Sequence, residues 1–328
     1  MFEAKLYSKL NGKVVCKLCW HKCRIEENER GFCNARINLN GKLYTLTYAN
    51  ISAVESRPIE IKPFYHFKPS SHSLTFSSYS CNLNCPWCQN WHLSKTFKEG
   101  YKIFPKELVE IALKNRDLSL CASFNEPTLL FEYLLDSFKI AKEFGLLNTM
   151  VSNGFMSLKA LEMLNLAGLD AINIDVKGND EVYEKYCGGK AKFVWRVISK
   201  AIDLNLHVEV VNLIVTDVND SIDIIKEVID NHLKYANKNI PLHFNRYFPA
   251  FIFEKPPTKI EILEKAAKLA KREGVEYVYI GNVRNKLENT YCPNCGELLI
   301  KRDGWRVIYN KIENGRCFKC GKEIYGVW

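Results

Sequence analysis

The sequence lacks any long apolar run. No stretch of its 328 residues approaches the roughly 18 consecutive apolar residues of a membrane-spanning helix, which excludes an integral helical membrane protein. The first residues, MFEAKLYSKLNGK, lack the apolar segment of a secretory signal peptide. There is no repeat of fixed sequence and no low-complexity linker. We therefore expect a cytoplasmic, soluble protein with no membrane partner.

The composition is that of a chain with a large core. Hydrophobic residues make up 47% of the sequence and aromatic residues 12%, which excludes a disordered chain. The length is compatible with two average domains or with one α/β barrel that carries attachments.

Thirteen cysteines are present, and eleven of them fall into three tight clusters. In a small secreted protein this number would indicate disulfides, but a large chain of the cytoplasmic type more often uses such clusters to bind metals. The remaining two, Cys121 and Cys187, are predicted to be structural, although Cys187 lies in a loop, KYCGG, and could approach a substrate.

Between the outer cysteine clusters, apolar strand-like runs alternate with amphipathic helix-like segments, a pattern typical of a parallel sheet covered by helices. Strands are predicted at 74–78, 118–124, 146–152, 169–176, 206–215, 241–247 and 275–281, and helices at 105–116, 128–145, 157–168, 192–205, 220–236 and 259–274. This favours an α/β fold with a partial or full TIM-type (β/α) barrel. The predicted domains are an N-terminal metal-binding segment (1–65), the barrel (66–287) and a C-terminal zinc ribbon (288–328).

The loop after the first predicted strand reads SCNLNCPWC and contains Cys81, Cys85 and Cys88. Three thiolates from one short loop can hold three corners of a [4Fe-4S] cluster and leave one iron open. An open metal position is typical of a catalytic site. S-adenosylmethionine (SAM) suits that iron because its amino and carboxylate groups can chelate it; an electron from the cluster would then split the sulfonium and give a 5′-deoxyadenosyl radical.

This loop resembles the cluster loop of radical SAM enzymes. Other stretches narrow the resemblance to the radical SAM member of the AmmeMemoRadiSam group, a relative of pyruvate formate-lyase activating enzyme: IEIKPFYHFKPSSHSLTFSSYS, SFNEPT, VSNGF, INIDVKG, PLHFNRYFP and VYIGNV. The resemblance extends over nearly the whole chain. One departure is that family members often carry a glycine shortly before the first cysteine, where this chain has Ser78, Tyr79 and Ser80. We expect the loop to reach the cluster without that freedom at positive φ.

Two loops are predicted to bind SAM. Asn125 and Glu126 occupy the place of the glycine-rich element that binds the SAM ammonium group in this superfamily, although an ordinary strand-to-helix turn is the alternative. Ser152 and Asn153 end the third strand and could contact SAM or cap the next helix.

Three further residues are predicted to be catalytic. Asp175 and Lys177 lie two apart on a strand and so point to one side; the resemblance implies contacts with SAM or substrate, and a structural ion pair is the alternative. Glu209 could also face the pocket. The resemblance places a histidine at His243, which could instead be a buried core residue.

The outer clusters offer four thiolates each. Cys292, Cys295, Cys317 and Cys320 form two CxxC pairs, the pattern of a structural zinc ribbon. The N-terminal set suits zinc or an auxiliary [4Fe-4S] cluster, with His21 as a substitute ligand; its members are Cys16, Cys19, Cys23 and Cys33.

The formal net charge is +9. With two zinc sites and one cluster in place, it would fall to roughly +4, which indicates a lysine-rich surface more than a nucleic-acid footprint. We therefore expect a radical SAM enzyme acting on a protein or small molecule, with an electron donor such as ferredoxin or flavodoxin. The alternatives are activation of a glycyl radical enzyme, RNA modification, and a non-enzymatic interaction module.

Overall fold

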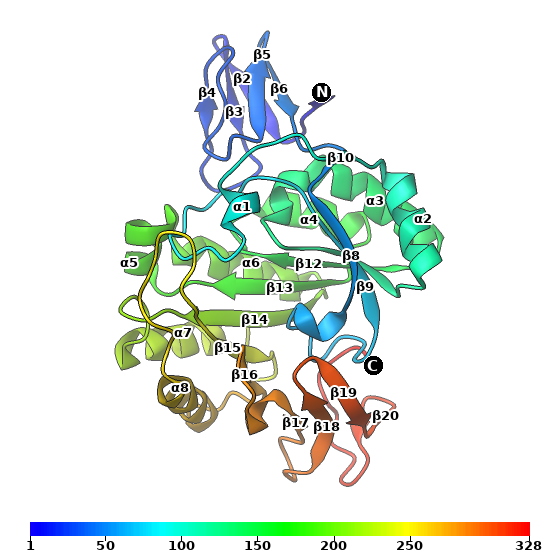
Figure 1. The fold of residues 1–328 in the computed structure, drawn as a ribbon, viewed down its shortest axis with the longest axis vertical. Coiled ribbons are helices and arrows are strands. Elements are labelled where there is room, and N and C mark those ends of the chain that lie inside the picture. Colours follow the sequence, from blue (N-terminus) through cyan, green and yellow to red (C-terminus); the bar gives the residue numbers. More distant parts are fainter.

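The computed structural model describes residues 1–328. Figure 1 shows three parts along the long axis: small N-terminal sheets at one end, a helix-covered sheet in the middle, and small C-terminal sheets at the other end. No helix combines the length and the apolar character needed to cross a membrane.

The middle part is built on one sheet of eight strands in the order β16-β15-β14-β13-β12-β11-β9-β8. Seven strands are parallel: β9 (His72–Ser77), β11 (Ser119–Ala122), β12 (Leu147–Ser152), β13 (Ala171–Val176), β14 (His207–Ile214), β15 (Leu242–Arg246) and β16 (Val278–Gly281). Strand β8 (Ala53–Pro58) pairs antiparallel with β9. The two edge strands, β8 and β16, do not pair with each other, so the sheet is open and a full barrel is not formed.

All six predicted helices are present. They are α2 (Pro105–Asn115), α3 (Phe131–Glu143), α4 (Leu158–Leu166), α6 (Ala191–Asp203), α7 (Ile222–Tyr235) and α8 (Ile260–Arg272). Each contacts the next in this order, so they form one layer along the sheet (Figure 1). Two begin at serine caps: the hydroxyls of Ser157 and Ser221 accept hydrogen bonds from the backbone N–H groups of Ala160 and Ile224. Short helices α1 (Trp91–Ser94) and α5 (Asp180–Val182) lie in loops.

The two faces of the sheet differ in chemistry because side chains alternate along each strand. The face toward the helices is apolar and belongs to the main core; it carries Phe76, Leu120, Ile172, Val208 and Phe244. The opposite face carries buried polar residues, among them Thr75, Thr149, Asn173, Glu209 and His243. The parallel register places Asn173 beside Glu209, and His243 beside Tyr279. Polar chemistry is therefore concentrated on the face that the helices leave free.

The N-terminal part consists of short strands in two sheets, β1-β6-β5 and β2-β3-β4. The strands are β1 (Phe2–Glu3), β2 (Tyr7–Leu10), β3 (Lys13–Cys16), β4 (Arg24–Ile25), β5 (Arg36–Leu39) and β6 (Lys42–Thr45), and a separate pair, β7 (Asn50–Ile51) and β10 (Tyr101–Lys102), follows. A buried ion pair connects this part to the helices: Arg36 donates to both carboxylate oxygens of Glu132 on α3 at 2.7 and 2.6 Å, with both side chains 1% exposed. Because a buried charge without its partner is costly, this pair fixes where the N-terminal sheets sit.

The C-terminal part contains the strands β17 (Thr290–Tyr291), β18 (Leu298–Asp303) and β19 (Arg306–Asn310) in one sheet, and β20 (Ile312–Glu313) with β21 (Arg316–Cys317) in another. Leu299 and Ile300 pack in a small core with Tyr65, Tyr277 and Tyr279. The C-terminal part therefore covers the polar face of the sheet near its β16 edge.

Candidate active site and metal centres

A cavity of about 470 Å³ opens where the parallel strands end. Because the carboxyl ends of parallel strands meet at one edge of the sheet, the loops that follow them converge there. The structure brings together all predicted residues of the three-cysteine loop and of the SAM pocket in its lining: Cys81, Cys85, Cys88, Asn125, Glu126, Ser152, Asn153, Asp175 and Lys177. His243 is not in this lining.

The three-cysteine loop follows β9 and contacts several neighbours through its sulfurs. The Sγ of Cys88 lies 2.9 Å from the hydroxyl of Ser94, and the Sγ of Cys81 accepts from the backbone N–H of Leu83 at 3.4 Å. The Sγ of Cys85 lies 3.5 Å from the Sγ of Cys187. Cys187, predicted to be structural, is thus buried directly behind a predicted cluster ligand.

Ser80, immediately before this loop, takes a backbone φ of 78°. We expected the loop to avoid positive φ, so that expectation is wrong. The left-handed conformation costs a non-glycine residue about 1 kcal/mol. Three hydrogen bonds hold it: the Ser80 N–H donates to the Leu93 carbonyl at 2.7 Å, Asn125 Nδ2 donates to the Ser80 carbonyl at 2.8 Å, and the Ser80 hydroxyl donates to the Cys33 carbonyl. Ser80 therefore adopts the positive φ for which family members often have a glycine.

Glu126 ties the second loop to the third. Its carboxylate accepts hydrogen bonds from the Thr128 N–H at 2.9 Å, the Ser152 hydroxyl at 2.8 Å and the Asn153 N–H at 2.8 Å. Burial raises the pKa of Glu126 and these hydrogen bonds lower it, with a net increase. The carboxylate is thus engaged with protein donors and holds Asn153 at the cavity wall.

The third loop also needs its glycine. Gly154 has a φ of 69°, and a Cβ atom there would lie 2.8 Å from Ile174 Cγ2 and 2.9 Å from Val194 Cγ1. Both the backbone conformation and the lack of space therefore require glycine in VSNGF.

Asp175 and Lys177 form an ion pair at the cavity wall. Burial lowers the pKa of Lys177. The nearby Asp175 carboxylate and the Cys85 thiol raise it by more, so the net shift of the pKa is upward. The second carboxylate oxygen, Asp175 Oδ1, is buried and has no hydrogen-bond partner. An unpaired buried acceptor in a cavity lining is the kind of group that a donor on a ligand would satisfy.

Sequence reasoning missed several lining residues. Lys62 is 5% exposed and its ammonium lies 4.0 Å from the centroid of the Phe124 ring. Burial lowers the pKa of Lys62. The segment IEIKPF contains this lysine, but nothing in the pattern indicated that it folds back over the polar face of the sheet. Trp87, Asn245, Tyr247 and Asn282 also line the cavity.

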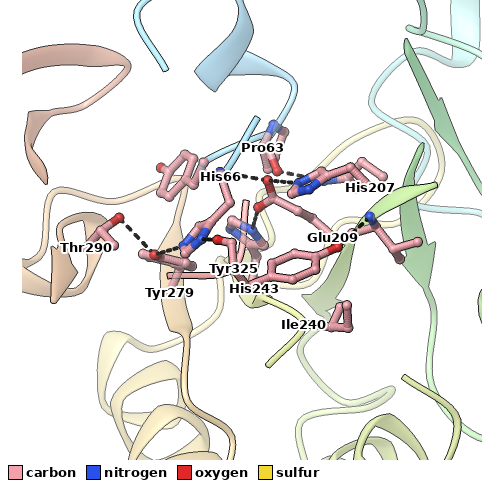
Figure 2. A network of polar contacts seen from close by, with 12 residues as sticks. Pro63, His66, His207, Glu209, Ile240, His243, Tyr279, Thr290 and Tyr325 are labelled. Atoms are coloured by element: carbon pink, nitrogen blue, oxygen red, sulfur yellow. Dashed lines mark hydrogen bonds and ion pairs between the residues drawn. The ribbon is translucent and has the colours of Figure 1, made fainter. Parts of the chain in front are cut away.

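His243 lies in a separate buried network around Glu209 (Figure 2). The two carboxylate oxygens of Glu209 meet His243 Nε2 at 2.7 Å and His207 Nε2 at 3.1 Å, and the backbone N–H of His66 donates to Glu209 at 2.8 Å. Burial raises the pKa of Glu209, but the two histidines outweigh it and hold the pKa well below its usual value. His243 thus faces Glu209 on one side.

The same network extends into the C-terminal part (Figure 2). His66 Nδ1 donates to the Tyr325 carbonyl at 2.5 Å, and burial lowers the pKa of His66 to about 3. The ring is therefore neutral, so its Nε2 accepts from the Tyr279 hydroxyl at 2.5 Å. The Tyr279 oxygen lies 2.9 Å from the Thr290 hydroxyl, to which Arg302 donates. These hydrogen bonds join the C-terminal part to the sheet and stabilise its position there.

We expect stability to decrease on acidification below about pH 6.5 because of buried neutral histidines. Burial lowers the folded-state pKa of His66 to about 3 and that of His232 to about 4. Between these values and about 6.5 the unfolded chain binds a proton at each histidine that the folded chain does not, costing up to about 1.4 kcal/mol per pH unit each.

Urea unfolding from pH 7 to pH 4.5 measures this slope. His232→Gln removes one titrating group, so its slope should be smaller than that of the wild type by about one proton. Equal slopes would contradict the assignment, and the comparison cancels any acid release of metal common to both proteins.

The four C-terminal cysteines could hold a metal ion. Their sulfurs all lie within 4.8 Å of one another, with 3.6 Å between Cys292 and Cys320 and 3.8 Å between Cys295 and Cys317. The two cysteine turns have the same backbone hydrogen bond. The N–H of Gly296 donates to the Cys292 carbonyl, and the N–H of Gly321 donates to the Cys317 carbonyl.

The N-terminal cysteines border the three-cysteine loop. The Cys33 carbonyl accepts from Ser80, and His21 Nε2 lies 2.7 Å from the Asn82 carbonyl. Burial is the main cause that raises the pKa of Cys33 to about 11, with smaller contributions from Cys16 and Cys23. The structure brings four sulfurs within 4.8 Å of one another in the C-terminal set and not in the N-terminal set.

Comparisons with known proteins give a family, two relatives and a solved structure of similar fold. A family model described as the radical SAM superfamily matches residues 76–231. A Methanocaldococcus jannaschii protein, "Uncharacterized protein MJ0808", is 40% identical over 332 residues, covering 99% of both chains. A second protein of that organism, named as a candidate glycyl-radical enzyme activating enzyme, is 28% identical over 163 residues, which is 48% of this chain and 67% of its own. The crystal structure of a radical SAM methyltransferase from Sphaerobacter thermophilus superposes with a TM-score of 0.50 at 14% identity, covering 66% of this chain and 68% of that one.

Proposed function

Because the chain belongs to the radical SAM superfamily, we propose that it binds a [4Fe-4S] cluster through Cys81, Cys85 and Cys88 and cleaves SAM reductively. When bound, the cluster would supply the electron that converts SAM to methionine and a 5′-deoxyadenosyl radical, which abstracts hydrogen from a substrate. The observation that carries this proposal is the cavity, whose lining joins these three thiols to the polar residues of four loops.

The remaining lining residues fit SAM by their chemistry. Asp175 Oδ1, buried and without a partner, is an acceptor for an ammonium group such as that of SAM. Lys177 holds the Asp175 side chain in place, and Glu126 does the same for the loop of Asn153. We assign His243 a positioning role through Glu209, because its ring nitrogen bonds that carboxylate.

Formation of 5′-deoxyadenosine tests the proposal. Anaerobically reconstituted protein should form it from SAM in the presence of dithionite. Material that contains about four irons at this loop and still yields no 5′-deoxyadenosine would overturn the proposed function. The reaction consumes one electron, and we propose a one-electron carrier such as ferredoxin or flavodoxin as the physiological donor.

We propose zinc at the C-terminal cysteines. A tetrahedron with Zn–S bonds of 2.3 Å has sulfurs about 3.8 Å apart, which fits the 3.6 and 3.8 Å separations of the two close pairs. For the N-terminal cysteines, zinc and an auxiliary cluster both remain proposals.

We expect Cys295→Ser to lower the zinc content by about one ion per chain, because a four-thiolate site has no spare ligand. Metal analysis of purified protein measures this. The matched variant Cys121→Ser, whose cysteine is buried in β11 and is not one of the four C-terminal cysteines, should keep its zinc. A loss of iron instead of zinc from Cys295→Ser would contradict the assignment.

A second candidate function is activation of a glycyl radical enzyme, which the similarity to the candidate activating enzyme of M. jannaschii favours. A glycyl radical signal in the electron paramagnetic resonance spectrum of a partner protein would test it. Membership of the AmmeMemoRadiSam group also stays a proposal, supported by the motifs SFNEPT, VSNGF and INIDVKG.

A further inference from the structure

A second cavity, of about 510 Å³, adjoins the first at the β16 edge of the open sheet. The two cavities share four lining residues: Ile61, Pro63, Asn245 and Asn282. Its outer wall is the turn between β18 and β19 in the C-terminal part. A ligand in the second cavity would therefore lie beside the first cavity, across the residues that the two linings share.

The lining of the second cavity carries an excess of negative charge. It includes the carboxylates of Glu60, Glu288 and Asp303 and one permanent cation, Arg284. Arg284 is largely exposed and already lies 3.5 Å from Asp303. Lys62 lines the first cavity and not the second.

Glu60 supplies an acceptor with no partner. It is 4% exposed; one carboxylate oxygen accepts from the Ser70 N–H at 2.8 Å, and the other, Oε2, has no hydrogen-bond partner. A buried carboxylate oxygen is costly unless a donor or a cation meets it. In a cavity lining, that group would come from a ligand.

Aromatic side chains also line the second cavity. Tyr65 and His243 lie in the wall, and Trp305, 62% exposed, stands at the turn between the strands. Arg302 fixes this wall by donating to the Tyr65 carbonyl at 2.8 Å and to Thr290 at 2.9 Å. The cavity is thus preformed, which reduces the entropic cost of binding. The Arg302 guanidinium already lies 4.2 Å from the centroid of the Tyr65 ring, so the exposed ring of Trp305 is the aromatic face that could attract an alkylammonium group.

We propose that the second cavity binds the substrate of the radical reaction through a primary ammonium group that pairs with Glu60, while an alkyl chain lies against Tyr65 and Trp305. The identification of this ligand as the substrate rests on the proposed function. The binding of an ammonium group at Glu60 does not. The ammonium group could belong to a lysine side chain of a peptide or protein, or to a small alkylamine.

Calorimetric titration of the full-length protein with n-hexylamine near neutral pH tests the proposal. Hexylamine should bind at least about tenfold more tightly than 1-hexanol, which has the same chain and no charge, and hexanoate should not bind. Glu60→Gln keeps an acceptor for Ser70 and should weaken hexylamine binding at least about tenfold. Trp305→Ala, an exposed position that should not disturb folding, should weaken it about threefold. Glu110→Gln, on the exposed face of α2, should bind as the wild type does.

The peptide acetyl-Gly-Lys-Gly-amide distinguishes the two sources. Binding at least as tight as that of hexylamine indicates a peptide or protein lysine, and binding of hexylamine alone indicates a small amine. Equal binding of 1-hexanol, or no effect of Glu60→Gln, would overturn the inference. The titration needs neither cluster nor SAM, so amine binding without 5′-deoxyadenosine formation would overturn the proposed function alone.

Discussion

Cys81→Ala, Cys85→Ala and Cys88→Ala should each reduce 5′-deoxyadenosine formation by at least about 10³-fold, a loss of the size seen when a central catalytic group is removed. The reason is that a cluster held at three corners has no spare protein ligand. Liquid chromatography of anaerobic reactions with SAM and dithionite measures the product. The iron content of each variant should fall by about four per chain.

Cys121→Ala is the matched control for this series. Its cysteine is buried in the central sheet but does not line the cavity, so iron content and product formation should stay at the wild-type level. Iron that remains bound in Cys81→Ala, together with undiminished product, would show that the cluster is held elsewhere in the chain.

Glu209→Ala should lower the free energy of unfolding by about 3–5 kcal/mol, because it leaves buried donors without their acceptor. Glu209 is 0% exposed and receives the His66 N–H, His207 and His243. These donors come from three segments of the chain, so the loss should affect the whole middle part and the attachment of the C-terminal part. Urea unfolding followed by circular dichroism measures it.

Two variants calibrate this result. Glu209→Gln keeps one oxygen acceptor and should cost less than the alanine variant. Glu110→Ala removes an exposed glutamate on α2 and should change stability by less than about 0.5 kcal/mol. If the free energy of unfolding of Glu209→Ala lies within about 0.5 kcal/mol of the wild-type value, the network does not stabilise the fold.

The β-α alternation was readable because its strands are apolar toward the helices and its helices are amphipathic. The predicted segments therefore correspond to the observed strands and helices, and the loops with Cys81, Asn125, Ser152 and Asp175 could be placed at one edge of the sheet. Closure could not be predicted, because it depends on whether the edge strands β8 and β16 meet, and local periodicity says nothing about that.

The hydrogen-bond partners of single residues could not be predicted from the sequence pattern either. The sequence predicts a catalytic role for His243, with a buried core histidine as the alternative, and in the structure its ring bonds Glu209, which also accepts from the distant His66. Ser80 takes a positive φ because Asn125 and Cys33 supply hydrogen bonds from two other segments. No local rule contains these partners.

The sequence by itself determined the cysteine clusters, the order of strands and helices, and the radical SAM superfamily, because ligand spacing and hydrophobic period are local properties of the chain. Only the tertiary structure decided that residues 59–71 fold over the polar face, that Lys62 and Glu60 end in different cavities, and that the C-terminal part forms the wall of the second one. These features depend on contacts between distant parts of the chain, such as Asn173 with Pro63 and Tyr65 with Arg302, and such contacts arise only when the chain is packed.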